Sequence, residues 1–211
     1  ANAGADQTSY VTNTIMLDGS GSSDVDGNSL MYHWAFTSRP VNSTATLSGS
    51  TTSANPTFTV DKFGTYVVSL IVNDGTVDST PDSVTISTLN SAPMANAGAG
   101  QAVYVNNTVT LDGSGSSDVD GDPLTYNWAF TSRPVNSAAT LNGSTSANPT
   151  FTVDKAGTYV VSLVVNDGTV DSAAATVTIT TLNSAPVANA GAGQSVYVCR
   201  EYRYFRWNRK F

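Results

Sequence analysis

The chain consists of two nearly identical copies of one unit, followed by the beginning of a third. The segment "ANAGADQTSYV" at Ala1 returns as "ANAGAGQAVYV" at Ala95 and as "ANAGAGQSVYV" at Ala188, at spacings of 94 and 93 residues. The first two copies differ at 20 of 93 aligned positions, and one residue is lost where "GSTTSANPTF" becomes "GSTSANPTF". A period of this length is too long for a solenoid repeat and matches a whole β-sandwich domain. We therefore expect one domain over residues 1–92 and a second over 93–185, with "TLNSAP" as the linker, and the first strand of a truncated third repeat over 186–198.

Each copy contains β-strand signals and no helical periodicity with caps. In "LMYHWAF" the residues Leu30, Tyr32, Trp34 and Phe36 alternate with the others, which is the period of two typical of a strand. "GTYVVSLIVNDG" shows the same alternation and ends in a turn signal, and "TIMLDGS", "ATLSG", "PTFTV" and "DSVTIS" add further short strands. About seven short strands per copy predict an all-β chain of two tandem immunoglobulin-like sandwiches.

Three positions of the first copy carry the expected core. Trp34 occupies the place of the buried tryptophan in the third strand of such sandwiches, and Tyr66, after Gly-Thr at a strand start, fits a tyrosine corner. Val68 stands near the place of the usual second cysteine, so we expect no disulfide and a core held by packing alone. The equivalent residues of the second copy are Trp128, Tyr159 and Val161.

The sequence resembles the PKD (polycystic kidney disease) domains of bacterial and archaeal surface proteins. The resemblance lies in "ANAGADQ", "VTLDGSGSSDVDGDPLTYNWAF", "NPTFTVDKAGTYVVSLVVNDGTVDS" and "TVTI", and it covers essentially all of residues 1–198. The frequent Trp-Asp-Phe-Gly-Asp-Gly stretch of this family reads "WAFTSRP" here, which points to the variant branch seen in chitinase-like and receptor-egg-jelly-like modules. The resemblance implies an immunoglobulin-like fold and an extracellular or cell-surface location.

Acidic loops suggest a calcium site in each copy. "DVDGN" and "DVDGD" place two carboxylates two residues apart before a glycine, and in a sandwich the "NDG" loop and the entering segment reach the same end. Some PKD-like domains of secreted collagenases, which this arrangement resembles, bind calcium at the entry segment. The alternative is an ordinary polar turn that uses Asp and Gly for their backbone geometry. The candidate ligands are Asn2, Asp24, Asp26 and Asp74 in the first copy, and Asn96, Asp118, Asp120 and Asp167 in the second.

Composition argues against several functional classes. Residues 1–198 carry fifteen Asp and no Glu against four basic residues, and such an acidic surface repels nucleic acid and anionic lipid. No apolar run is long enough to span a membrane. The single histidine, His33, is replaced by Asn127 in the second copy, and neither Gly-x-Ser-x-Gly nor His-Glu-x-x-His occurs, so we expect no enzyme. Arg39 and Arg133 are interpreted as solvated loop residues rather than contacts for a partner.

The final residues, 199–211, do not follow the repeat. They hold five of the nine basic residues, the only Cys and the only Glu. Codons compatible with Cys199–Phe211, read one nucleotide later, give Val-Gly-Asn-Thr-Val-Thr-Leu-Asp-Gly-Thr-Gly-Ser, and ten of these twelve residues match "VNNTVTLDGSGS" of the second copy. We interpret this tail as a frameshifted, non-native end of the third repeat rather than as a basic binding segment.

Near-identical copies favour a function that increases with their number, such as reach or valency. The sequence therefore predicts a non-catalytic spacer or adhesion module of a secreted or cell-surface protein, with weak contacts to protein or carbohydrate. The alternative is an accessory carbohydrate-binding module of a secreted enzyme that degrades polysaccharide or protein. The expected partners are the other repeats of the chain and a surface or matrix protein or polysaccharide, without nucleic acid or membrane insertion.

Overall fold

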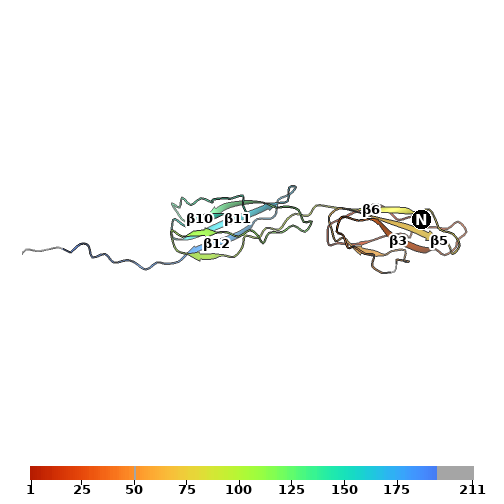
Figure 1. Ribbon diagram of the computed structural model, residues 1–211, viewed down its shortest axis with the longest axis horizontal. Coiled ribbons are helices and arrows are strands. Elements are labelled where there is room, and N and C mark those ends of the chain that lie inside the picture. The colour runs from red at the N-terminus through yellow and green to blue at the C-terminus, as the bar shows by residue number, and fades with distance from the viewer. Residues whose placement is uncertain (50, 194–211) are drawn as a thin grey trace, which may run out of the picture.

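The computed structural model describes residues 1–49 and 51–193 and shows two β-sandwiches placed end to end, joined by one passage of the chain (Figure 1). The described residues contain strands and no helix, which confirms the all-β prediction. The strands of the first domain are β1 (Gln7–Ser9), β2 (Thr14–Met16), β3 (Met31–Ser38), β4 (Thr57–Thr59), β5 (Thr65–Asn73) and β6 (Asp82–Thr88). The strands of the second domain are β7 (Gln101–Val103), β8 (Thr108–Thr110), β9 (Thr125–Ser132), β10 (Thr150–Thr152), β11 (Thr158–Asn166) and β12 (Ala175–Thr181).

Both domains have the same topology. One sheet has the order β1-β6-β5-β3 in the first domain and β7-β12-β11-β9 in the second, and it faces a two-stranded sheet, β2-β4 or β8-β10. The first strand pairs in parallel with the last, whereas the other pairs are antiparallel. The first and last strands of each domain therefore lie side by side in the larger sheet, and the chain enters at one end of the sandwich and leaves at the other.

Each domain has six strands, one fewer than the sequence suggested. The expected strand "ATLSG" is reduced to a single bridge between Ser48 and Thr57 in the first domain and between Asn142 and Thr150 in the second. In the second domain the start of this segment is held elsewhere, because the Ala138 N–H donates to Asp154 Oδ2 at 2.6 Å. The segment therefore diverges from β10 after one pair of hydrogen bonds.

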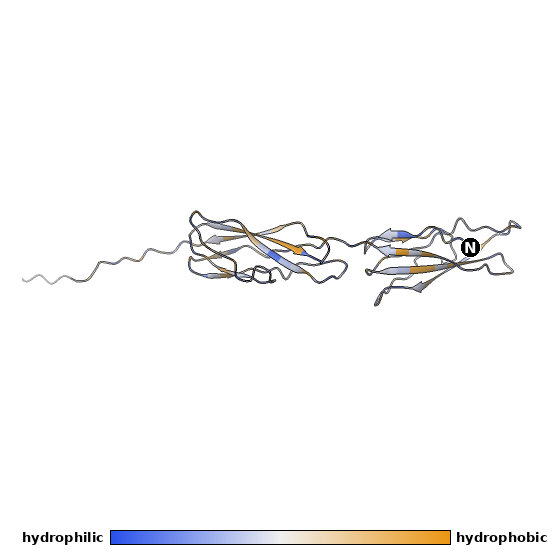
Figure 2. Cartoon of the chain, turned by 90° about the horizontal axis from the view of Figure 1, so that it is seen from above, coloured by the Kyte–Doolittle hydropathy of each residue, from blue (hydrophilic) through white to orange (hydrophobic). Residues whose placement is uncertain are grey.

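The core follows the predicted alternation. Along β5 every second residue from Tyr66 to Val72 is buried, and along β11 the same holds from Tyr159 to Val165. Figure 2 shows hydrophobic stretches within strands of both domains. Trp34 and Trp128 are 5% and 3% exposed, so both predicted tryptophans are core residues.

An aromatic cluster closes the core at the tyrosine corner. In the second domain Phe130 and Phe151 meet edge to face with ring centroids 5.0 Å apart, and Phe151 lies 5.5 Å from Tyr159. The Tyr159 hydroxyl is 2.8 Å from Asp154 Oδ1, and it accepts from the Lys155 N–H at 2.9 Å. The first domain repeats this cluster with Phe36, Phe58, Tyr66 and Asp61.

The two loop arginines, Arg39 and Arg133, pack against the aromatic clusters of their domains. The Arg133 guanidinium lies 5.1 Å from the centroid of the Phe130 ring and donates from Nη1 to the Ala139 carbonyl. Arg39 makes the same contacts with Phe36 and Ala45. Each arginine therefore ties the irregular segment after the third strand to the core, besides being solvated as the sequence suggested.

The linker is attached to both domains. The Leu89 N–H donates to the Ser9 carbonyl at 2.7 Å, which ties the beginning of the linker to the first domain. Met94 forms bridges with Ser117 and Ala173, so the end of the linker lies against the second domain. The interpretation of the tail 199–211 concerns residues outside the described part, and no helix in the described residues is long and apolar enough to cross a membrane.

Candidate metal centre at the domain joint

The loop between β8 and β9 forms a tight turn around one carboxylate. Asp118 Oδ1 accepts hydrogen bonds from the N–H groups of Asp120 at 2.8 Å, Gly121 at 3.1 Å and Asp122 at 3.4 Å. Gly121 has a φ of +89°, a conformation that glycine adopts without steric cost. The sequence "DVDGD" therefore folds its second and third Asp back toward the first.

Three carboxylates of this turn converge. One oxygen each of Asp118, Asp120 and Asp122 lies within 4.8 Å of the others, and all three residues are half-buried. Two buried oxygens, Asp118 Oδ2 and Asp120 Oδ1, have no hydrogen-bond partner among the described residues. A buried carboxylate oxygen without a partner is costly, and a hard cation bound to oxygen ligands would relieve that cost.

The linker covers this cluster with two polar contacts. The Ser91 N–H donates to Asp120 Oδ2 at 2.6 Å. The Asn90 side-chain amide donates to Asp167 Oδ2 at 2.8 Å, and Asp167 follows β11 in the neighbouring loop. Two successive linker residues therefore join the two loops that carry the carboxylates.

Asp167 is held by its own turn as well as by the linker. Its Oδ1 accepts from the N–H groups of Thr169 at 2.7 Å and Val170 at 2.8 Å, and the residue is 6% exposed. These hydrogen bonds, first that from Val170 and then that from Asn90, lower the pKa of Asp167 to about 2. Asp167 is therefore a fixed negative charge beside the cluster.

Asp122 has a pKa that is shifted in the opposite direction from that of Asp167. Its pKa is raised above the usual range, first by desolvation and then by the negative charges of Asp118, Asp120 and Asp167. The shift shows that an additional negative charge is unfavourable at this end of the domain. A cation would reverse that preference, because it stabilises the ionised form of each neighbouring carboxylate.

The structure brings only some of the predicted ligands together. Asp118 and Asp120 share the cluster, and Asp167 lies close enough to raise the pKa of Asp122, whereas Asn96 turns elsewhere. Asn96 Oδ1 accepts from the Gly98 N–H at 2.9 Å, and its backbone N–H donates to Ser116 Oγ. Asn96 thus stabilises the turn at the start of the second domain. The linker residues Asn90 and Ser91 contact the acidic loops in its place.

The first domain has the same turns without the cluster. Asp24 Oδ1 accepts from the N–H groups of Asp26 and Asn28, and Asp26 is exposed. Asp24 and Asp74 line one pocket of about 120 Å³, but Asp74 accepts its hydrogen bonds from Thr76 and Val77 in its own turn. Asn2 resembles Asn96, since its Oδ1 accepts from Gly4. In the part of the chain that the structure describes, the only group of three potential ligands is that of the second domain.

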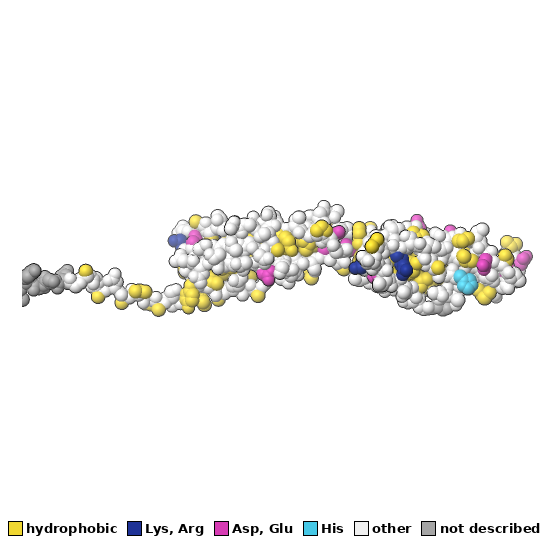
Figure 3. Space-filling model, viewed as in Figure 1, with side chains coloured by type: hydrophobic (Ala, Val, Ile, Leu, Met, Phe, Trp, Pro, Cys, Tyr) yellow, Lys and Arg dark blue, Asp and Glu magenta, His cyan; other side chains and the backbone are white. Residues whose placement is uncertain are grey.

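Sequence reasoning missed three participants, namely Asp122, Asn90 and Ser91. Asp122 was visible as the last residue of "DVDGD", where the first copy has Asn28. Asn90 and Ser91 were assigned only a linker role, because no local pattern shows that a linker folds back onto loops 29 and 77 residues further along the chain. Figure 3 shows acidic side chains at several separate places on the visible face, with some at the junction of the two domains.

Comparisons with known proteins agree with this architecture. A family model described as "K319L-like, PKD domain" matches residues 3–88 and 97–181. The mouse "Dyslexia-associated protein KIAA0319 homolog" is 32% identical over 201 residues, which cover 90% of this chain and 18% of the relative. The mouse "Dyslexia-associated protein KIAA0319-like protein" is 27% identical over 190 residues, covering 88% of this chain and 18% of that protein. The chain therefore spans less than a fifth of the length of these relatives.

A solved structure shares the sequence pattern of one domain. The solution structure of the PKD domain from KIAA 1837 protein is 30% identical, with 48% of this chain and 98% of that chain covered and a TM-score of 0.38.

Proposed function

The chain belongs to the K319L-like PKD domain family, and from this premise we propose that it is a non-catalytic spacer and adhesion module whose joint binds calcium. The module belongs, in this proposal, to a secreted or cell-surface protein. The observation that carries the calcium proposal is the pair of buried, unpartnered oxygens, Asp118 Oδ2 and Asp120 Oδ1, beneath the linker.

The residues at the joint suit a hard divalent cation. Calcium takes six to eight oxygen ligands from carboxylates, carbonyls and water, with flexible geometry. Asp118, Asp120 and Asp122 would hold the ion, and Asp167 adds negative charge beside them. The absence of His and Cys from this cluster makes calcium a better candidate than zinc.

The ion would act on the joint rather than on a substrate. It would neutralise like charges that otherwise repel one another, and it would hold Asp120 in the position where it accepts from the Ser91 N–H. The linker would then leave the second domain less often, so the angle between the domains would vary less. A stiffer chain projects farther than a flexible chain of the same length, which suits a spacer.

The test compares calcium with a chelator on the intact chain. With about 10 mM Ca²⁺ and a site of about 0.1 mM affinity, linkage adds about 2.7 kcal/mol of stability, which corresponds to a rise of roughly 10 °C or more in the melting temperature of the second domain. Small-angle scattering should show a longer particle with calcium. Asp118→Asn combined with Asp120→Asn keeps acceptors for the turn and should abolish both effects.

The matched control is Asp24→Asn combined with Asp26→Asn in the first domain, which should leave the response of the second domain unchanged. Calorimetry without binding heat, together with equal melting curves in calcium and in chelator, would reduce "DVDGD" to an acidic turn. A rise in melting temperature without a change in scattering would support calcium binding but would refute the proposal that calcium stiffens the joint.

A further inference from the structure

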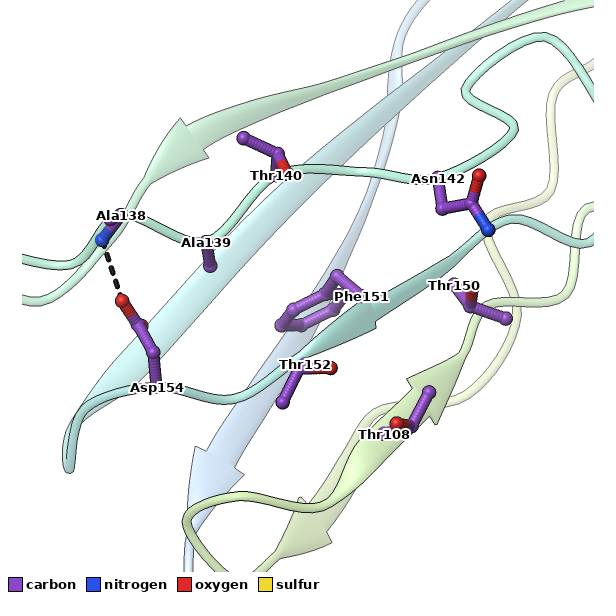
Figure 4. Close-up of a pocket in the computed structure, with 9 residues that line it drawn as sticks. All are labelled: Thr108, Ala138, Ala139, Thr140, Asn142, Thr150, Phe151, Thr152 and Asp154. Atoms are coloured by element: carbon purple, nitrogen blue, oxygen red, sulfur yellow. Dashed lines mark hydrogen bonds between the residues drawn. The ribbon is translucent and has the colours of Figure 1, made fainter.

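A shallow groove of about 540 Å³ lies on the second domain and is lined by none of the residues of the joint (Figure 4). One wall is the segment from Ala138 to Asn142, and the other is strand β10 with its neighbour β8. The ring of Phe151 lies between the two walls and is only 2% exposed, so it belongs to the floor. The groove is the space left where the seventh strand of the sandwich does not form.

The two walls are joined at both ends and separate between them. At one end Asn142 and Thr150 exchange two backbone hydrogen bonds of 2.7 and 3.0 Å, and at the other the Ala138 N–H is bound to Asp154. No backbone hydrogen bond joins Thr140 to Thr152, which would form the next pair in this part of the chain. Because both ends are closed within a few residues, another β-strand has no room to pass between the walls, and a ligand has to lie over them.

The surface of the groove is rich in free hydroxyl groups. Four threonines and one asparagine line it, and in the described structure none of their side chains has a hydrogen-bond partner within the protein. These residues are Thr108, Thr140, Asn142, Thr150 and Thr152. A threonine hydroxyl both donates and accepts, and the amide of asparagine offers two donors and one acceptor.

The single charged residue of the groove is already occupied. Asp154 Oδ1 lies 2.6 Å from Ser137 Oγ and 2.8 Å from the Tyr159 hydroxyl, while Oδ2 accepts from Ala138. A cationic ligand would have to compete with these hydrogen bonds, and an anionic ligand would find no positive partner among the lining residues. The groove is therefore suited to an uncharged ligand with many hydroxyl groups.

We propose that this threonine-lined groove binds a neutral oligosaccharide through its free threonine hydroxyls and the Asn142 amide. The inference rests on the adhesion role proposed above and gives the chemical class of its ligand. Each sugar hydroxyl is a donor and an acceptor, as is each threonine hydroxyl that it would meet. Since Phe151 is buried and offers no exposed face for stacking, a single groove binds weakly, with an affinity in the millimolar range or about −4 kcal/mol.

The first domain carries the equivalent residues. They are Thr14, Thr46, Ser48, Thr57 and Thr59, so four threonines are kept and serine stands in the place of Asn142. The hydroxyls of Thr14 and Thr59 lie 3.4 Å apart and bond to each other, so fewer hydroxyls are free here than in the second domain. Ser48 and Thr57 also exchange two backbone hydrogen bonds, as Asn142 and Thr150 do. Binding of one long polysaccharide to both domains at once would raise its apparent affinity by about 10²-fold or more.

The probes are the neutral hexasaccharides cellohexaose, xylohexaose and mannohexaose, with hexagalacturonate as the anionic control, titrated into the intact chain to about 10 mM and followed by amide chemical shifts. At least one neutral probe should shift the amides of Thr140, Asn142 and Thr152. Thr140→Val combined with Thr152→Val keeps the shape of both side chains and should weaken this binding at least about fivefold. Thr178→Val, on the outer face of β12 in the other sheet, is the matched control and should bind as the unaltered chain does.

The proposal is refuted if no neutral probe shifts the amides, or if the shifts are confined to other surfaces. It is also refuted if hexagalacturonate alone binds, or if the valine variant binds as the unaltered chain does. The calcium response is measured on the same sample. If the chain responds to calcium but binds no glycan, the proposal that the groove binds an oligosaccharide is refuted and the proposed spacer role stands. A chain that binds a glycan without responding to calcium refutes the ion at the joint instead.

Discussion

Replacing Trp128 with alanine tests the core of the second domain. The side chain is 3% exposed, its Nε1 donates to the Ser146 carbonyl at 3.0 Å, and its ring lies against Gly113. Removal of such an aromatic costs about 3–5 kcal/mol, and the unpaired carbonyl adds about 1 kcal/mol where it stays buried. A domain of this size has a total stability of roughly 5–13 kcal/mol, so the variant should lose a third of its stability or more.

Urea unfolding followed by far-ultraviolet circular dichroism reports on both domains, and tryptophan fluorescence of the alanine variant identifies the transition of the first domain. Trp34 remains as the fluorescent residue of the first domain, besides Trp207 in the tail, and the free energy of unfolding of that domain should change by less than about 0.5 kcal/mol because the altered site is distant. Trp128→Phe retains most of the apolar volume and loses the N–H, so it should cost distinctly less than alanine. Equal midpoints for the alanine variant and the unaltered chain would refute the assignment of Trp128 to the core.

Three further predictions concern single features of the second domain. Because the pKa of Asp154 is lowered to about 2, first by the Ser137 hydroxyl, its contribution to stability is complete above about pH 4 and should disappear as the pH falls toward 2, measured as a falling melting temperature. Gly113→Ala places a Cβ 2.9 Å from Trp128 Cζ2 and should cost about 1–3 kcal/mol in urea unfolding, while Gly193→Ala, in open space, should cost nothing measurable. Asn90→Ala removes a donor to Asp167 and should raise the pKa of that carboxyl in an NMR titration, and an unchanged pKa would contradict the contact.

The fold was largely predictable because its determinants are local and repeated. The alternation in "GTYVVSLIVNDG" requires one buried face, and the structure buries Tyr66, Val68, Leu70 and Val72. The seventh strand was predicted wrongly from "ATLSG", whose composition suits a strand. Its failure to form depends on contacts with residues outside the segment, since Asp61 accepts from the Thr44 N–H and Arg39 donates to the Ala45 carbonyl. The strand propensity of the five residues "ATLSG" contains no information about those contacts.

The candidate site was predictable only in part for a related reason. The spacing of Asp118 and Asp120 identified the loop, and the sandwich topology placed Asp167 at the same end. The contribution of Asn90 and Ser91 depends on the direction in which the linker leaves β6, which no local pattern encodes. The prediction of Asn96 as a ligand depended on the entry segment arriving at that end, and the segment does arrive there, but with Asn96 bound to its own turn.

The difference between the two copies shows what makes the joint special. Their acidic loops differ only where Asn28-Ser29 stands in place of Asp122-Pro123, yet Asp26 is exposed while Asp120 is half-buried. The carboxylate of Asp120 accepts from the Ser91 N–H, a group that belongs to the preceding linker. Burial of the cluster is therefore a property of the junction rather than of the domain. "TLNSAP" recurs after the second domain with Asn183 and Ser184 in equivalent positions. Each junction of this sequence, followed by a "DVDGD" loop, would reproduce the same site, so that calcium would stiffen a longer array at every joint.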